Sequence, residues 1–340
     1  MGVNGWLLNK FRHINKERMN KHLDILSKTT GKSKLYIKID MFLNFLTRGC
    51  GYTDYFRGNY IDLSSKEKDT FVTAKKFYKI LEYLNDSNYI KYLNNKLLFN
   101  NMFKEYLKRD YIDLSKSNSS DLKKFVKDKK TVFAKQIDGE GGHGIKKISY
   151  KDVLDFDKLY DELVSNNQLL VEEEIKQCDE VNEINPNVVN SFRIITLYKD
   201  KKVYVIGNAF RINQDDSNVI GCTNDLYFSM NREGVIDSNV IDDYGNIYIE
   251  HPLTKKKFAD VKIPGVDKAF DMCIEAHKKI PQVRYIGWDI AFSNKGPVMV
   301  EGNEYPGYGL VQFYKLKNKR TGHLKEIADV LGDEMKNIKI

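Results

Sequence analysis

Two acids and an amide near the end of the chain have the residue types and spacing of a metal site. Asp289 lies in one apolar segment, and Glu301 and Asn303 lie in the next. If residues 294–296 form a three-residue hairpin loop, Asp289 pairs directly opposite Glu301, and Asn303 shares a strand face with Glu301. Opposed carboxylates repel each other, and Mg²⁺, which prefers oxygen ligands, would relieve that conflict. The alternative is an exposed, solvated hairpin face, which the apolar neighbours disfavour.

A glycine-rich turn at 139–144 has the composition of a phosphate-binding loop. Glycines allow main-chain N–H groups to approach a phosphate closely, and a lysine, Lys135, stands in the short apolar strand before the turn. Such a lysine is costly unless a negative group meets it. The turn is neither a Walker loop nor a dinucleotide fingerprint, because no helix follows it. A plain flexible turn is the alternative, in which His143 is a surface residue rather than a phosphate contact.

The segment Leu169–Ile175 is an apolar strand that runs into three acids, Glu172, Glu173 and Glu174. It is open to two interpretations. The strand simply ends in water, or it forms a nucleotide hinge in which backbone groups pair with adenine and a downstream acid binds the ribose hydroxyls. The segment alone does not decide between them.

Periodicity predicts an α+β fold of antiparallel hairpins with a few helices, rather than a doubly wound parallel sheet. Residues 1–128 have mostly helical patterns, with one helix over 65–84 and another over about 96–108. From residue 131 strand patterns dominate. We expect strands at 131–137, 144–150, 169–175, 191–198, 203–212, 285–292 and 297–304, and a late helix at 267–279.

Composition is that of a soluble globular protein. The chain has 340 residues, enough for two or three packed units, with 41% hydrophobic and 30% charged residues. No apolar run approaches the roughly 18 residues of a membrane-spanning helix. Four scattered cysteines without a CxxC pair predict reduced thiols rather than a zinc site. The first residues lack the apolar stretch of a signal peptide, so we expect a cytoplasmic protein.

The first forty residues are basic, with nine Lys and Arg against three Asp and Glu, an excess of six positive charges. Apolar residues recur there at roughly helical spacing, namely Trp6, Leu7, Phe11, Ile14, Leu23 and Leu26. A basic amphipathic helix would lie on an anionic membrane or bind an acidic glycan. The alternative is a helix that packs on the protein and shows its cations to water. Nucleic acid is not expected, because no binding signature accompanies the charge.

Taken together and in this order, these segments resemble the ATP-grasp superfamily. The matching series is Asn95-Lys96, Lys135 with the turn at 139–144, the hinge at 171–175, Asp289, and Glu301-Gly-Asn303. A closer resemblance is to the sugar-transfer-associated ATP-grasp proteins, found near bacterial polysaccharide genes. It is carried by the segments 187–193, 286–291 and 300–303. Ser191 stands where that family has Thr, and Glu174 replaces a usual aromatic.

The resemblance implies two α+β lobes whose antiparallel sheets grip ATP, preceded by a mostly helical N-terminal region. The implied division is 1–94 for the helical region, 95–175 for the small lobe with its lid, and 176–340 for the large lobe. Lys96 and Lys135 would contact the ATP phosphates, under a lid that contains Gly139, Gly141, Gly142, His143 and Gly144. Glu172, Glu173 and Ile175 would line the adenine, with Glu180 or Glu183 near the ribose. Asp289, Glu301 and Asn303 would hold Mg²⁺, and Arg193 and Arg211 would contact the γ-phosphate and the acyl-phosphate.

The implied activity is that of an ADP-forming carboxylate–amine ligase, which makes an amide through an acyl-phosphate. We expect the carboxylate to be a uronic acid of a bacterial capsular or surface polysaccharide or of its sugar precursor, joined to an amine substrate. The basic N-terminal segment would contact this acidic glycan or a membrane. Two rival functions are a kinase of the same fold that phosphorylates a sugar or an amine, and a non-catalytic nucleotide-binding partner of a glycosyltransferase.

Overall fold

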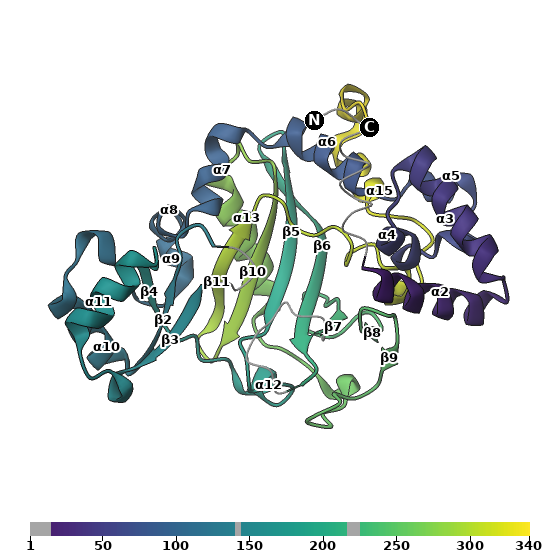
Figure 1. Ribbon diagram of the computed structural model, residues 1–340. Helices are drawn as coiled ribbons and strands as arrows, with labels where there is room; N and C mark the ends of the chain where they lie inside the picture. The colour runs from purple at the N-terminus through teal and green to yellow at the C-terminus, as the bar shows by residue number, and fades with distance from the viewer. Residues whose placement is uncertain (1–14, 140–143, 216–224) are drawn as a thin grey trace.

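The computed structural model describes residues 15–139, 144–215 and 225–340. It contains two antiparallel sheets with helices around them, and Figure 1 shows the smaller sheet on the left, the larger one in the centre and a cluster of helices on the right. The predicted α+β class is therefore confirmed.

The small sheet has four strands in the order β1-β4-β2-β3. Helices α10 and α11 cover one of its faces, as their shared core with Val132, Ala134 and Val171 shows. Since strand residues alternate between faces, Lys135 and Glu172 lie on the opposite face, toward the large sheet (Figure 1). The elements are β1 (Tyr111–Asp113), α10 (Ser119–Lys129), β2 (Thr131–Lys135), β3 (Ile145–Ser149), α11 (Phe156–Ser165) and β4 (Leu170–Glu173).

The large sheet has seven strands in the order β11-β10-β5-β6-β7-β8-β9. Helix α13 (Val266–Lys278) covers one face, where it packs on Phe192, Trp288 and neighbouring side chains of the main core. The intervening residues, among them Arg193 and Asp289, point to the other face. The strands are β5 (Ser191–Lys199), β6 (Lys202–Asn213), β7 (Asp225–Phe228), β8 (Val240–Ile241), β9 (Ile247–Tyr248), β10 (Tyr285–Ser293) and β11 (Gly296–Asn303).

The β10–β11 hairpin has a two-residue turn and a β-bulge instead of the predicted three-residue loop. Ser293 pairs with Gly296, and this register continues up to the pair Ile290–Met299. It then shifts by one residue at Val300. Because of this extra residue, Met299 lies in the main core while the residue two positions later lies on the opposite face.

The described N-terminal region is helical, but the single helix predicted over 65–84 is wrong. The chain forms two helices there and leaves helical geometry around Val72. The Gln312 side chain accepts a hydrogen bond from Val72 N (3.0 Å) and donates one to Val72 O (2.7 Å), so it replaces the helical partners of that residue. The helices are α2 (Lys16–Thr30), α3 (Lys34–Arg48), α4 (Tyr52–Arg57), α5 (Ser65–Asp69), α6 (Ala74–Leu84), α7 (Ser87–Asn94), α8 (Lys96–Met102) and α9 (Lys104–Leu107).

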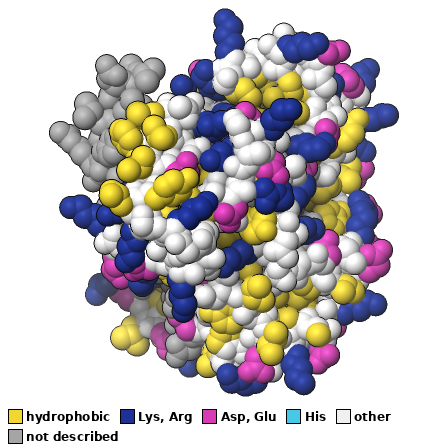
Figure 2. All heavy atoms as spheres, turned by 90° about the vertical axis from the view of Figure 1, so that its right-hand side faces the viewer, with side chains coloured by type: hydrophobic (Ala, Val, Ile, Leu, Met, Phe, Trp, Pro, Cys, Tyr) yellow, Lys and Arg dark blue, Asp and Glu magenta, His cyan; other side chains and the backbone are white. Residues whose placement is uncertain are grey.

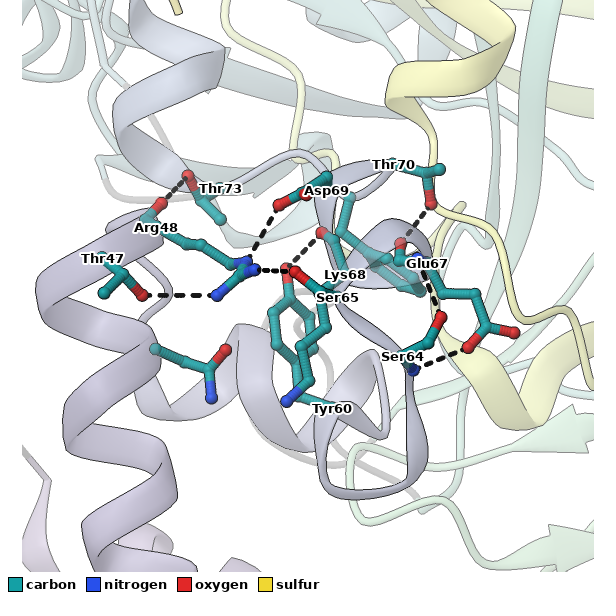
Figure 3. Close-up of polar contacts among 12 residues, drawn as sticks. Thr47, Arg48, Tyr60, Ser64, Ser65, Glu67, Lys68, Asp69, Thr70 and Thr73 are labelled. Atoms are coloured by element: carbon teal, nitrogen blue, oxygen red, sulfur yellow. Dashed lines mark hydrogen bonds and ion pairs between the residues drawn. The ribbon is translucent and has the colours of Figure 1, made fainter.

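Polar contacts fix the end of α3 to the start of α5 (Figure 3). Arg48 donates to Asp69 Oδ1 (2.9 Å) and to Ser65 Oγ (2.7 Å), and its carbonyl oxygen accepts a hydrogen bond from Thr73 Oγ1 (3.0 Å). Ser64 and Glu67 form a capping box that begins α5. These contacts hold α3 in one orientation on the helical cluster.

The helices do not form a separate core. Leu23 and Leu26 of α2 are buried with Tyr227 and Ile241 of the large sheet, so of the two alternatives given for this pattern, packing on the protein holds for these two residues. The other four residues of that pattern lie outside the described residues. Helices α8 and α9 pack in the core of the large sheet. The lobe boundaries at 94 and 175 therefore stay predictions.

The remaining helices are α12 (Asp179–Asn182), α14 (Tyr314–Lys317) and α15 (Leu324–Leu331). Within the described ranges, no helix has both the length and the apolarity needed to cross a bilayer. Cys50, Cys178 and Cys273 are buried free thiols, as predicted.

Stability should fall as the pH is lowered from 6.5 toward 5, because two buried histidines resist protonation. Burial lowers the pKa of His277 and of His323 from 6.5 to about 4. In the unfolded chain these imidazoles take up protons below pH 6.5, so each one removes up to about 2 kcal/mol of stability between pH 6.5 and 5. Urea unfolding at several pH values measures this. His277→Gln should make the dependence shallower, and a flat profile between pH 6.5 and 5 would contradict the assignment.

Candidate active site

Three charged side chains meet across adjacent strands of the large sheet, on the face opposite α13. Asp289 pairs directly with Glu301 on β11, as predicted, and with Arg193 on β5. Arg193 donates to both carboxylate oxygens of Asp289, with Nη2 2.6 Å from Oδ2. The expected repulsion between the two acids is therefore relieved in part by an arginine, before any metal binds.

Among the described residues, no arginine donates to both carboxylate oxygens of Glu301 as Arg193 does to Asp289. The Glu301 carboxylate therefore stays suited to a metal. Burial raises its pKa and the charge of Asp289 adds to the rise, while Arg193, Lys96 and Lys135 oppose it. Asn303 completes the group, with its side-chain nitrogen 3.4 Å from Glu301 Oε1 and 3.5 Å from Asp289 Oδ2. Turning this amide over would present its oxygen instead.

The donor set fits Mg²⁺, which takes carboxylate and amide oxygens and keeps further positions for water or phosphate. No cluster of three or more His, Cys, Asp or Glu side chains in the described residues is suited to a metal. A cation held by Asp289 and Glu301 would have the amide of Asn303 as its third protein ligand.

Gly287 makes room beneath the charged side chains. It lies opposite Asn303, and a Cβ there would sit 2.4 Å from Pro306 Cβ and 3.0 Å from Arg193 Cδ. Since real Cβ atoms do not approach so closely, glycine is required for the chain after β11 to fold back over the sheet beside Arg193.

On the small sheet, Lys135 is held by Glu172. Lys135 Nζ lies 2.5 Å from Glu172 Oε2, and Asn100 Nδ2 donates to Glu172 Oε1 at 2.9 Å. Burial alone would raise the pKa of Glu172, but Arg109 and Lys135 together hold it well below its usual range. The Glu172 carboxylate is thus engaged in positioning Lys135, which revises the expectation that this side chain lines the adenine.

Arg109 joins the two sheets. Its Nη2 and Nε donate to Glu172 Oε1 (2.6 and 3.1 Å), and its Nη1 donates to Met299 O (2.5 Å) at the β11 bulge. A weaker contact reaches Val300 O at 3.4 Å. The side chains of Arg109 and Glu172 are 3% and 2% exposed, so this pair is shielded from water. Arg109 therefore couples the strand that carries Glu172 to the strand that carries Glu301.

Lys96 stands at the base of the predicted lid. Its Nζ donates to Gly139 O, and its backbone N–H donates to Ile137 O at 2.8 Å. Burial lowers the pKa of Lys96, while the nearby Glu301 opposes this effect. Gly144, at the other end of the lid, has φ +70°, and a Cβ there would meet Gln136 Oε1 at 2.5 Å. Gly141, Gly142 and His143 lie outside the described residues.

Other predicted site residues lie farther from this group. The Glu173 carboxylate faces away from the site, 3.2 Å from Asp110 N and 3.5 Å from Lys129 Nζ. Ile175 is half-buried after β4. Glu183 pairs with Lys256 at 2.5 Å. Glu180 is exposed on α12, which lies beside the β10–β11 turn (Figure 1), where Cys178 N donates to Phe292 O.

Arg211 lies on the same sheet face as Arg193, one strand farther from the metal ligands. It pairs opposite Ser191, whereas Arg193 pairs opposite Ala209. Its Nε and Nη2 donate to Asp225 Oδ2 at 2.9 and 2.8 Å. It is thus held at the side of the site, toward β7.

Sequence reasoning missed Arg109, Asn100 and Gly287. Arg109 precedes a strand of only three residues, and no local pattern marks it. Its two partners are 63 and 190 positions away in the chain. Gly287 stood within a segment that the resemblance had singled out, but its steric role depends on Pro306. Only the folded chain brings these residues to the site.

Two antiparallel sheets that face each other, with lysines on one and acids on the other, define an ATP-grasp fold. The sequence model for sugar-transfer associated ATP-grasp proteins matches residues 76–321, well over half of the chain. The chain belongs to the sugar-transfer associated ATP-grasp family. The resemblance stated from the sequence is thereby confirmed.

Solved structures of similar fold are more distant. The ATP-grasp ligase PsnB in complex with a minimal precursor has 14% identity and a TM-score of 0.45, over 73% of this chain and 63% of that one. D-alanyl-alanine synthetase A from Vibrio cholerae has 12% identity and a TM-score of 0.43, over 73% and 65%. Biotin carboxylase from Campylobacter jejuni has 12% identity and a TM-score of 0.44, over 70% and 46%. This chain thus spans less than two thirds of each of them, and no curated protein matches its sequence.

Replacing Arg109 by Met should destabilise the protein strongly, because Glu172 would lose its main partner while staying buried. Breaking one side of such a pair costs about 3–5 kcal/mol. Arg109→Met/Glu172→Met should recover part of the loss. Urea unfolding measures both variants. Lys325→Met, which breaks an exposed ion pair with Asp329, is the control and should change stability by less than about 1 kcal/mol. Equal losses in Arg109→Met and Lys325→Met would contradict the proposed coupling.

Proposed function

We propose that this protein is an ATP-dependent carboxylate–amine ligase that acts on a sugar acid, with Mg²⁺ as its metal. The observation that carries the proposal is the group on three adjacent strands in which Asp289 lies opposite Glu301 and accepts from Arg193. Lys96 and Lys135 lie close enough for their charges to oppose the rise in the pKa of Glu301. Such an arrangement supplies positive charge for phosphates and oxygen ligands for a divalent cation.

Each residue has a role in this proposal. Lys96 and Lys135 bind the ATP phosphates beneath the glycine-rich lid, and Asp289, Glu301 and Asn303 hold Mg²⁺. When bound, Mg²⁺ neutralises phosphate charge and orients the γ-phosphate. Glu172 and Arg109 keep Lys135 in place without touching the substrate. Backbone groups around Glu173 and Ile175 would receive the adenine.

The reaction needs only positioning and charge neutralisation. A substrate carboxylate oxygen attacks the γ-phosphorus, the bond from that phosphorus to the β,γ-bridging oxygen breaks, and ADP leaves. An amine then attacks the acyl-phosphate carbonyl carbon, expels phosphate, loses a proton and leaves an amide. Arg193 lies beside the metal ligands, where it would stabilise the transferred phosphoryl group. Arg211 lies one strand away, where it would receive the acyl-phosphate or the substrate carboxylate.

The family description favours a substrate connected with sugar transfer. A uronic acid supplies the carboxylate that the ligase chemistry needs and the sugar that this context suggests. We therefore propose an acidic sugar of a capsular or surface polysaccharide, or its precursor, as one substrate and an amine as the other. The reaction would take place in the cytoplasm, where ATP is available.

Asp289→Asn should weaken Mg²⁺-dependent nucleotide binding at least about tenfold, because it removes a charged metal ligand and disturbs Arg193. Calorimetric titration with a non-hydrolysable ATP analogue, with and without Mg²⁺, measures this. Asp271→Asn is the matched control, since Asp271 is exposed and pairs with Arg232 at the surface. Equal affinities for wild type and Asp289→Asn in the presence of Mg²⁺ would overturn the metal assignment.

Hydroxylamine should trap the activated carboxylate. With ATP, Mg²⁺ and a panel of uronic-acid glycans, ADP release should accompany hydroxamate formation for one acid and should be lost in Lys135→Ala. ADP release with a stable phosphorylated product and no hydroxamate would instead establish the kinase. Tight nucleotide binding without turnover on any acid or alcohol tested would favour the non-catalytic partner.

A further inference from the structure

Helix α3 carries a stripe of large apolar side chains that the protein leaves exposed. Six residues on one side of the helix are 50% to 69% exposed. They follow a helical spacing that keeps them within one arc of the surface. Figure 2, which views the molecule from this side, shows hydrophobic side chains gathered among lysines and arginines. We call this set the α3 stripe, and it consists of Leu35, Tyr36, Ile39, Phe42, Leu43 and Leu46.

The exposure of the stripe does not come from a loosely attached helix. On its inner side, α3 buries Ile37 and Met41 in the core of the helical cluster. Its start is capped by Ser33, whose side chain accepts from Tyr36 N at 3.2 Å. Its end is fixed through Arg48, as Figure 3 shows. The outer side is therefore held in one orientation, and contiguous exposed apolar surface of this kind marks an interaction site.

Positive charges outnumber negative ones around the stripe, although Lys34 pairs with Asp24 and Lys32 lies 3.7 Å from Asp62 Oδ1. From residue 15 to residue 48 the chain has eight Lys and Arg against three Asp and Glu, an excess of five positive charges. Lys34 and Lys38 are exposed beside the stripe, and Lys32 Nζ lies 5.6 Å from the centre of the Tyr36 ring. The only acid in α3, Asp40, points inward, where it accepts from Tyr55 Oη at 2.5 Å.

We propose that α3 docks this protein on the surface of a membrane that contains anionic phospholipids. A rigid helix with an apolar side that includes an aromatic residue, bordered by lysines, matches the interfacial region of such a bilayer. A second copy of this chain fits the α3 stripe less well than such a membrane does. A two-fold contact between stripes would bring together two surfaces with the same excess of positive charge, and like charges oppose such a contact.

This proposal goes beyond the ligase chemistry and stands or falls independently of it. The stripe lies on the helical cluster, which Figure 1 shows at the opposite end of the large sheet from the small sheet. Docking through α3 would therefore leave the small sheet and strands β10 and β11 on the side away from the bilayer (Figure 1).

Vesicle sedimentation without nucleotide tests the proposal. The full chain should bind vesicles of phosphatidylcholine mixed with phosphatidylglycerol and should not bind phosphatidylcholine alone. A variant with Leu35→Gln, Ile39→Gln, Leu43→Gln and Leu46→Gln should lose binding at least about tenfold. All four positions are exposed, so the variant should keep the wild-type unfolding midpoint, which is measured in parallel.

The matched control replaces exposed apolar residues elsewhere, namely Leu154→Gln, Ile249→Gln and Leu253→Gln, and should bind as wild type does. Three outcomes would overturn the proposal. They are no binding of the wild type to anionic vesicles, equal binding of the α3 variant, and a wild-type dimer in solution that the α3 variant converts to a monomer. Each of these readouts is independent of ATP turnover, so a failure of the ligase proposal leaves the test unaffected.

Discussion

The active-site geometry depends on one buried ion pair, that between Arg109 and Glu172. Removing two charges from water is costly, and the pair is stable because both of its side chains make further hydrogen bonds. Glu172 accepts from Arg109, Lys135 and Asn100, while Arg109 also reaches the carbonyl of Met299. Hydrogen bonds of this kind strengthen one another in a low-dielectric interior. The position of Lys135 is thereby tied, through Glu172 and Arg109, to the strand that carries Glu301.

A second feature is that charges of both signs are in place before any ligand binds. The small-sheet side contributes Lys135 and Lys96, and the large sheet contributes Arg193, Asp289 and Glu301. Arg193 is already turned onto Asp289, the residue opposite it on the neighbouring strand. Dipoles and charges held in advance cost no reorganisation during the reaction, which is the main way that a site without a covalent nucleophile accelerates phosphoryl transfer.

Local patterns predicted the elements well and long-range contacts poorly. The apolar runs that became β2, β5, β6, β10 and β11 were recognisable because alternation and turn residues are local properties. The helix predicted over 65–84 failed because Gln312, far away in sequence, takes the backbone partners of Val72. The three acids at 172–174 left open whether the strand ends in water, and for Glu172 it does not, because this side chain is buried against Arg109 and Lys135. Such errors are expected wherever tertiary contacts override a local preference.

The bulge at Val300 lets Met299 and Glu301 of the β10–β11 hairpin lie on opposite faces of the sheet, although they are two residues apart. In a regular strand, Met299 and Glu301 would face the same side, so either a methionine would leave the core or an acid would enter it. Because of the extra residue Val300, Met299 stays in the core on one face of the sheet while Glu301 lies on the opposite face. Loss of Val300 alone would therefore turn the hairpin into a regular ladder in which Met299 still faces Ile290 and Glu301 still faces Asp289, so a change of strand length at this one position leaves both side chains on their present faces.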